Sequence, residues 1–127
     1  MQTAEQYKQW HKTWYQTKGK TIVSEYNKNY AQTLKGRFNL YKAHSKRRGI
    51  EMNLTLSEFS EIVSKPCTYC GISGIKLGID RLDNNIGYLK QNSVSCCKVC
   101  NFMKKSMTHI DFLNHIKKII INNLFTN

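Results

Sequence analysis

The chain has 127 residues, with twenty Lys and Arg against eight Asp and Glu, and a formal net charge of +12 at pH 7. This length fits one compact domain with at most an extension, and the charge favours nucleic acid over an anionic membrane as the partner. No apolar run approaches the roughly 20 residues of a membrane-spanning helix, and the opening residues MQTAEQYKQW lack the apolar core of a signal peptide. We therefore expect no membrane partner and a place in the cytoplasm or nucleoid.

The first 48 residues carry eleven Lys and Arg against two acidic residues. Aromatic and apolar residues recur there at steps of three and four, which predicts two helices, and Gly19 predicts the break between them. Such stripes fit packing against the rest of the protein, or stacking on bases between phosphate-binding lysines. We predict that residues 1–36 form a basic helical DNA-binding arm. The residues at those steps are Tyr7, Trp10, Trp14, Tyr26, Tyr30, Leu34, Phe38 and Tyr41.

The pattern of basic and aromatic residues changes after residue 48. We predict that residues 37–127 form a second region, which is a folded domain. Gly49 is predicted to end a helix, and a short extended link follows it. Thr55 with Glu58 three positions later is a capping box, so a helix should begin there and close before Pro66.

Two Cys-x-x-Cys pairs, Cys67 with Cys70 and Cys97 with Cys100, are separated by 26 residues. They match the four-thiolate ligand set of structural zinc, which leaves no open position for water. Free thiols or two disulfides are the alternatives, and a reducing cytosol disfavours bridging. Cys96 directly precedes Cys97 and is expected to be a small buried apolar residue.

Between the cysteine pairs the sequence predicts a β-hairpin, with strands at residues 76–80 and 93–97 and a turn at 83–88. Asp80 ends the first strand. Asp83 lies in the turn, where Asp and Asn commonly cap the backbone.

The last predicted element is a helix over residues 108–124. Thr108 and Asp111 form its capping box, and an apolar stripe at helical spacing predicts that it packs on the core. The stripe consists of Ile110, Leu113, Ile116, Ile120 and Leu124.

The stretches PCTYCG, GIDRLDNNIGYLKQNSV and CCKVCN, in this order, resemble the zinc-containing branch of the HNH nucleases. The resemblance covers about residues 37–118 and implies that residues 37–127 form a zinc-containing HNH nuclease domain. It implies an α+β fold, in which a ββα-metal core of the treble-clef type is stabilised by a zinc ion on four cysteines, preceded by basic helices and followed by a packing helix. It also implies a metal-dependent DNA endonuclease of the homing or phage type, which hydrolyses phosphodiester bonds by nicking or by double-strand cleavage.

The same resemblance implies a role for each matching residue. Asp80 corresponds to the carboxylate that binds the catalytic divalent ion, Mg²⁺ or Mn²⁺, and Asn101 to another ligand of that ion. Asn92 corresponds to the amide that ties down the hairpin loop. Arg81 stands where most of the family has a histidine as general base, and a guanidinium has no lone pair to take a proton. We expect Arg81 to contact the phosphate and stabilise its developing charge.

Another group must then activate the attacking water, and basic residues must hold the DNA. The candidates for activation are the metal ion, Asp83, His44, His109 and Tyr88. The residues predicted to contact nucleic acid are Arg37, Lys42, His44, Lys46, Arg47, Arg48, Lys104 and Lys105.

Three other functions stay open at this point. Replacement of the usual histidine suits a catalytically inactive, zinc-stabilised module that binds DNA or RNA. Zinc-bearing members of the resembled family include Holliday-junction resolvases, which need a homodimer. Basic Cys-x-x-Cys proteins also occur in RNA processing. The prediction therefore allows RNA in place of DNA, and it allows a homodimer.

Overall fold

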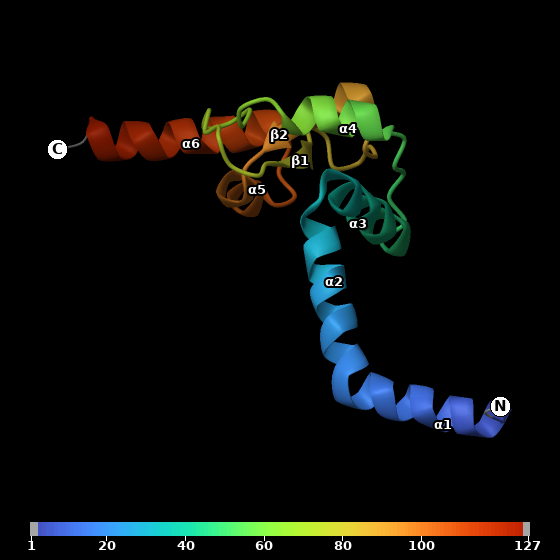
Figure 1. The fold of residues 1–127 in the computed structure, drawn as a ribbon. Helices are drawn as coiled ribbons and strands as arrows, with labels where there is room; N and C mark the ends of the chain where they lie inside the picture. The colour runs from blue at the N-terminus through green and yellow to red at the C-terminus, as the bar shows by residue number, and fades with distance from the viewer. Residues whose placement is uncertain (1–2, 126–127) are drawn as a thin grey trace. The chain divides into compact units, whose positions relative to one another are not determined.

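The computed structural model describes residues 3–125, and the chain divides into two compact units, Met1–Leu40 and Tyr41–Asn127. The first unit is built from helices, and the second combines helices with one two-stranded sheet (Figure 1). The predicted α+β class is thus confirmed. The first two residues of the predicted arm and the last two of the predicted nuclease domain lie outside the described residues.

The first unit begins with three successive helical segments, α1 (Ala4–Trp14), a π-helical turn (Tyr15–Gly19) and α2 (Lys20–Gln32). The predicted break at Gly19 is therefore wrong, because the helix continues through this residue. Gly19 is buried, and a Cβ atom there would collide with the ring of Trp14. The glycine thus makes room for an aromatic ring on the helix surface.

The helix break lies at Thr33, between α2 and α3 (Leu34–Arg47). Thr33 has an extended backbone with φ −71° and ψ 156°. Its hydroxyl donates to the Tyr30 carbonyl at 2.7 Å and accepts the Gly36 amide hydrogen at 3.0 Å. A threonine that bonds the backbone on both sides competes with the helical hydrogen bonds, and the apolar spacing alone does not reveal this.

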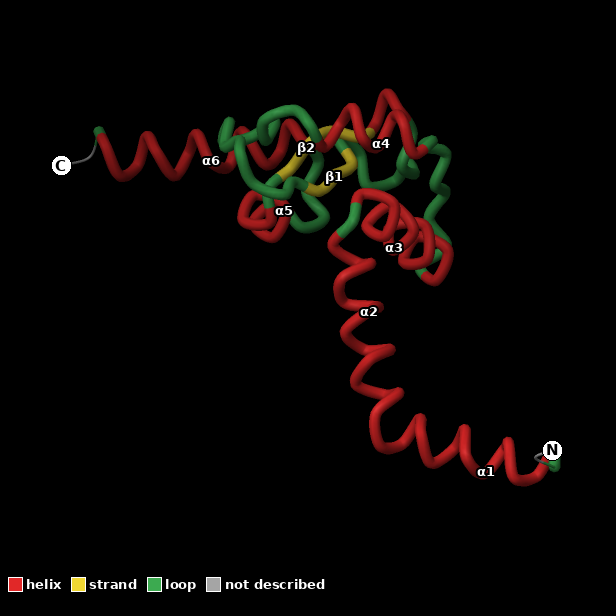
Figure 2. The backbone as a smooth tube through the Cα atoms, in the orientation of Figure 1, coloured by secondary structure: helices red, strands yellow, loops and turns green. Residues whose placement is uncertain are grey.

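The sheet of the second unit is an antiparallel hairpin of β1 (Gly78–Arg81) and β2 (Ser93–Cys96), in which Asp80 pairs with Val94. Figure 2 shows the two short strands surrounded by loops. The predicted strands are confirmed to within two residues at their ends. Gly78 permits a close approach, because a Cβ atom there would collide with the Tyr41 hydroxyl, which accepts the Ile79 amide hydrogen at 3.1 Å.

Helix α4 (Leu56–Val63) packs against both strands. Its predicted capping box is confirmed: the Thr55 hydroxyl accepts the Glu58 amide hydrogen at 3.2 Å, and the Glu58 carboxylate accepts the Thr55 amide hydrogen at 2.9 Å. Phe59 of this helix is fully buried, and its ring centroid lies 5.5 Å from that of Tyr41. Other buried apolar residues of this unit include Leu54, Ile62, Ile79 and Tyr88.

Helices α5 (Lys98–Lys104) and α6 (His109–Leu124) complete the unit. Thr108 caps α6 by accepting the Asp111 amide hydrogen at 3.1 Å. The helix packs through Phe112, while much of its apolar stripe stays exposed and its C-terminal part extends beyond the rest of the unit (Figure 1). Within residues 3–125, no helix has both the length and the apolar character needed to cross a membrane.

Candidate metal centre and active site

Four cysteine side chains converge beside the hairpin. The sulfur atoms of Cys67, Cys70, Cys97 and Cys100 all lie within 4.8 Å of one another. Each Cys-x-x-Cys pair forms a tight turn, called a knuckle. The first knuckle is closed by the Gly71 amide, which donates to the Cys67 carbonyl at 2.9 Å. Gly71 has a φ of +75°, which glycine adopts without strain. The second knuckle is the beginning of α5, where Cys97 is the N-cap and its sulfur accepts the Cys100 amide hydrogen at 3.4 Å.

The spacing of these sulfur atoms fits a tetrahedral zinc ion. Zn–S bonds of about 2.3 Å at tetrahedral angles place two ligand sulfurs about 3.8 Å apart, and the sulfurs of Cys70 and Cys97 lie 3.7 Å apart. All five cysteines of the chain are free thiols. The disulfide alternative is therefore not what the structure shows, and the predicted four-cysteine cluster can hold zinc.

Backbone amides favour the thiolate form at one of the four sulfurs. Burial opposes the ionisation of Cys67, but hydrogen bonds from the amides of Cys70, Cys97 and Tyr69 outweigh it and lower its pKa from 9.0 to about 6. Burial raises the pKa of Cys100, and hydrogen bonds with neighbouring cysteines raise it further. A bound cation would reverse this second effect, because metal binding releases the thiol protons.

Cys96 lies beside this cluster without belonging to it. The side chain is 1% exposed, and its sulfur donates to the Cys97 carbonyl at 3.3 Å. Burial raises the pKa of the Cys96 thiol. The expectation of a small buried residue at this position is confirmed.

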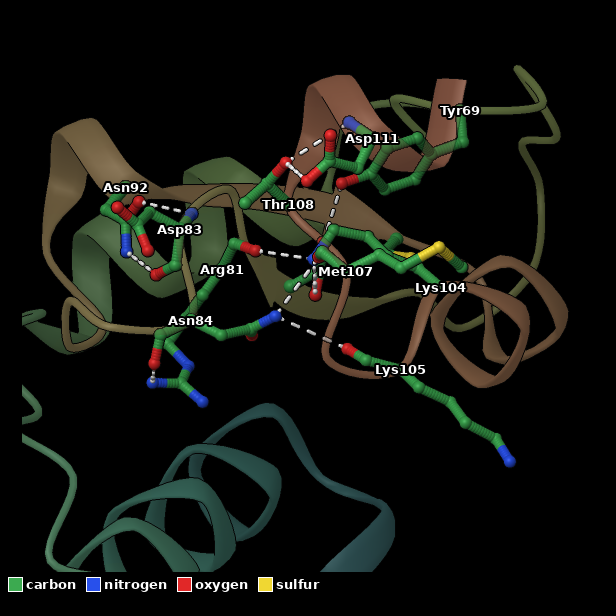
Figure 3. A network of polar contacts seen from close by, with 12 residues as sticks. Tyr69, Arg81, Asp83, Asn84, Asn92, Lys104, Lys105, Met107, Thr108 and Asp111 are labelled. Atoms are coloured by element: carbon green, nitrogen blue, oxygen red, sulfur yellow. Dashed lines mark hydrogen bonds and ion pairs between the residues drawn. The ribbon is translucent and has the colours of Figure 1, made fainter. Parts of the chain in front are cut away.

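The Asp80 carboxylate lies in a buried polar cluster at the end of β1. It is 5% exposed, and its Oδ2 accepts the Tyr69 hydroxyl hydrogen at 2.7 Å. The ammonium of Lys104, from α5, lies 3.2 Å from Oδ2 and 3.4 Å from Oδ1. The same ammonium donates to the Arg81 carbonyl at 2.9 Å (Figure 3). Both carboxylate oxygens are therefore engaged within the protein.

Tyr69 is held in its neutral form as the donor of this hydrogen bond. Burial raises the pKa of the Tyr69 hydroxyl, and the hydrogen bond to the Asp80 carboxylate raises it further. Its ring packs against Phe112 of α6, with 5.3 Å between the centroids. The knuckle, the hairpin and α6 thus meet at this side chain.

The prediction that Lys104 contacts nucleic acid is wrong. Its side chain is fully buried, because it is the cation that neutralises Asp80 inside the unit. Lys104 lies four residues after the buried Cys100 on α5, so both side chains face the hairpin. That helical spacing is the signal in the sequence that indicates this position, and neither the Lys104 contact nor the Tyr69 contact was among the predictions.

The expected site for a divalent ion, between Asp80 and Asn101, does not fit such an ion as the side chains are arranged. Mg²⁺ and Mn²⁺ prefer accessible oxygen ligands, whereas the Asp80 oxygens are occupied by an ammonium and a hydroxyl. Asn101 is exposed on α5. Within residues 3–125, the four cysteines are the group of three or more His, Cys, Asp or Glu residues that brings ligand atoms together.

Arg81 holds the hairpin loop. Its Nη1 donates to the carbonyls of Asn84 at 2.8 Å and Ile86 at 3.0 Å, and its Cζ lies 5.4 Å from the centroid of the Tyr88 ring. The residue is 8% exposed. Successive side chains of a strand point to opposite faces, so Arg81 faces the loop while Asp80 faces α5. In this arrangement the guanidinium is a positioning group.

Asn92 binds the same loop from its other end (Figure 3). Its Nδ2 donates to the carbonyls of Asp83 and Gly87, each at 2.9 Å, and its Oδ1 accepts the Asp83 amide hydrogen at 2.9 Å. The Asp83 carboxylate accepts the Asn85 amide hydrogen at 2.8 Å, which is an Asx turn. Asp83 is therefore a turn residue in this structure.

The histidine and tyrosine side chains that were predicted to activate water differ in their burial and in their contacts. His109 packs against the Tyr69 ring with 5.4 Å between centroids, and its Nδ1 is buried without a hydrogen-bond partner in the described part of the chain. Tyr88 is buried in the core beside Tyr41. His44 is exposed on α3. Among them, His109 contacts the residue that binds Asp80.

The basic residues predicted to contact nucleic acid are mostly at the surface. Arg37 is half-buried, and Lys105 is exposed with its Nζ 5.2 Å from the centroid of the Phe102 ring. The exposed members on the C-terminal half of α3 and just after it are Lys42, His44, Lys46, Arg47 and Arg48.

No protein-family model matches the chain. It is 33% identical over 99 residues to the uncharacterized protein R423 of Acanthamoeba polyphaga mimivirus, covering 68% of this chain and 19% of that protein. It is also 33% identical over 87 residues to an uncharacterized 29.0 kDa protein from the dda-modA intergenic region of Enterobacteria phage T4, covering 63% of this chain and 35% of that protein. The chain thus spans only part of the length of these relatives.

Among solved structures, the rare-cutting HNH restriction endonuclease PacI matches with a TM-score of 0.53 and 22% sequence identity. The match covers 65% of this chain and 72% of that chain. It shows the fold: helices with a small antiparallel sheet in an HNH-like arrangement. The four-cysteine cluster of this chain can hold zinc.

Proposed function

We propose that the chain is an HNH-type endonuclease that hydrolyses phosphodiester bonds in DNA. The observation that carries this proposal is the HNH-like fold with Asp80 at the end of β1, between the first cysteine knuckle and α5. PacI, an endonuclease, shares that fold. The net charge of +12 supports a polyanionic substrate. The relatives from a virus and a phage support a homing or phage type of nuclease that acts in the host cytoplasm.

The proposal assigns a structural zinc ion to the four cysteines, because a complete set of sulfur ligands leaves no position for water or phosphate. The proposed hydrolysis requires Mg²⁺ or Mn²⁺. In the present arrangement Lys104 occupies the Asp80 carboxylate, which would otherwise bind this ion. Arg81 and Asn92 act as positioning residues, since both fix the loop that follows β1.

The DNA-binding part of the proposal includes both the helical arm and α3. Helix α1 buries none of its residues, and the rings of Trp10 and Trp14 stack along it at 6.5 Å. Trp10 is 54% exposed and Tyr26 of α2 is 68% exposed. Exposed rings between lysines suit stacking on bases and contacts with phosphates, so we keep residues 1–36 as a DNA-binding arm.

Cleavage of supercoiled plasmid tests the nuclease proposal. Zinc-loaded protein should produce nicked circles in Mg²⁺ or Mn²⁺ and none when neither ion is added, and Asp80→Asn should lower the rate on the order of 100-fold, as for loss of one positioned electrostatic group. Asp111→Asn, which changes an exposed acid on α6, is the matched control and should cut like the wild type. Zinc content is measured for every variant. Equal nicking by the wild type and Asp80→Asn would end the proposal.

A second candidate function is supported by the engaged side chains at the site. Arg81 replaces the usual base and is bonded to loop carbonyls, and both Asp80 oxygens are occupied. A zinc-stabilised module that binds DNA or RNA without cutting fits these contacts. It predicts a gel shift with plasmid or RNA and no nicked product at any ion concentration.

The basic end of α3 should determine much of the salt dependence of DNA binding. Replacing Lys46, Arg47 and Arg48 by Gln should reduce the slope of log K against log salt by about 2 to 3, since each phosphate contact contributes about 0.9. Fluorescence anisotropy with a labelled duplex at several salt concentrations gives the slope. The control is Lys117→Gln with Lys118→Gln, two exposed lysines on α6. A slope that changes no more than in the control would remove α3 from the binding surface.

A further inference from the structure

The Asp80 carboxylate already has a cation of its own. Three oxygen atoms lie within 3.4 Å of the Lys104 Nζ: both carboxylate oxygens of Asp80 and the carbonyl oxygen of Arg81. The ammonium donates hydrogen bonds to Asp80 Oδ1 and to the Arg81 carbonyl, and it forms an ion pair with Asp80 Oδ2. Lys104 is 0% exposed and Asp80 is 5% exposed. The pair is thus a desolvated ion pair in the centre of the candidate site.

The surroundings keep the ammonium in place. The beginning of α5, which carries Lys104, is fixed by Cys97 and Cys100 of the metal centre. Tyr69 covers the other side of the carboxylate through its hydrogen bond to Oδ2. The Tyr69 ring is in turn packed against His109 and Phe112 at the start of α6. The ion pair is therefore enclosed by the knuckle, α5 and α6.

A divalent ion would need the same oxygen atoms. Mg²⁺ binds its oxygen ligands at about 2.0–2.1 Å and keeps an octahedral shell, which requires an accessible carboxylate oxygen. Two cations on one buried carboxylate also repel each other strongly at low dielectric. The ammonium and a divalent ion therefore compete for Asp80.

We propose that the Lys104 ammonium is the resident cation of the Asp80 site and excludes divalent ions from that carboxylate in the free protein. The inference deepens the proposed function and rests on it for the expected place of the ion. It follows that, in the proposed nuclease, a divalent ion reaches Asp80 only when the Lys104 side chain leaves it. Lys104 is a positioning residue that sets the charge of the site.

Mn²⁺ binding to the zinc-loaded full chain, followed by the electron paramagnetic resonance signal of free Mn²⁺, tests this proposal. The wild type should show no Mn²⁺ site that depends on Asp80. Lys104→Met, with an apolar side chain of similar length, should gain one site with an affinity increased on the order of tenfold or more, because the competing charge is gone. The site should disappear again in the double variant Lys104→Met with Asp80→Asn.

The matched control is Lys105→Met, which removes the same charge from the neighbouring exposed position. It should bind Mn²⁺ like the wild type, so any gain in Lys104→Met comes from the site and not from the net charge. Zinc content and the thermal midpoint show whether each variant is folded. If Lys104→Met is unfolded, Lys104→Gln, which keeps hydrogen-bond donors without the charge, is judged in its place.

Two results would overturn the proposal. One is a wild type that binds one Mn²⁺ ion and loses it with Asp80→Asn. The other is a folded Lys104 variant that binds Mn²⁺ no more tightly than Lys105→Met does. The Mn²⁺-binding experiment does not measure cleavage. A wild type that fails to nick plasmid would therefore end the proposed function and leave this inference standing.

Discussion

Removal of the metal from the four cysteines should unfold the second compact unit, Tyr41–Asn127. Zinc in comparable small sites contributes an apparent 10–16 kcal/mol, roughly, to folding, which is as large as the whole stability of about 5–15 kcal/mol of an ordinary domain. The buried cluster around the centre is small: among the described residues it contains three of the four cysteines (Cys67, Cys97 and Cys100), Leu77 and Cys96, with the partly buried Tyr69 packed against it. Little apolar contact would then hold the knuckles together.

Hydrogen exchange of the β1 and β2 amides is the appropriate measurement, because helices of the first unit contribute to the circular dichroism of the whole chain. Protection should be lost on chelation and in Cys100→Ser, and it should return when zinc is added back to the wild type. Cys96→Ala is the control, since Cys96 is buried next to the cluster and is not one of the four. It should keep one zinc per chain. Chelated protein with unchanged protection would show that the cluster is not needed for the fold.

Replacing Asn92 by Ala should destabilise the second unit by about 1–3 kcal/mol, since a buried polar group left unpaired costs about that much and the Asp83 amide loses its partner. The residue is 5% exposed. Its side chain bonds the carbonyls of Asp83 and Gly87 and the amide of Asp83, each at 2.9 Å. Alanine leaves the Asp83 amide without a partner, whereas the carbonyls of Asp83 and Gly87 keep the amides of Ile86 and Leu89 as donors. The hairpin loop would then depend on the contacts of Arg81.

Urea unfolding of the zinc-loaded protein measures this effect. Asn85→Ala is the matched control, because it removes an exposed amide from the same loop and should change the stability little. Asn92→Asp should also destabilise the unit, since a carboxylate can still accept the Asp83 amide hydrogen but cannot donate to the two carbonyls. If Asn92→Ala is as stable as Asn85→Ala, the amide does not hold the loop.

Local spacing in the sequence predicted α4, α6, the two strands and the grouping of the four cysteines. The Thr55 and Thr108 caps depend on residues three positions away, and such contacts follow from the helix itself. The strands at Gly78–Arg81 and Ser93–Cys96 follow from short apolar runs. The four cysteines could be grouped because each knuckle is a local turn that supplies two sulfur atoms, and a tetrahedral zinc ion needs four ligands.

The partners of the charged residues were decided only by the tertiary structure. Asp80 and Lys104 are 24 positions apart. The spacing of Lys104 from Cys100 indicates the side of α5 on which the lysine lies, but it does not indicate its partner. Arg81 was expected to bind phosphate because of its place in a motif, whereas strand geometry turns it into the loop. Long charged side chains can lie at the surface or pair inside with almost the same local sequence. Long-range packing selects between these states, and here it placed a cation of the protein on the carboxylate expected to bind a metal ion.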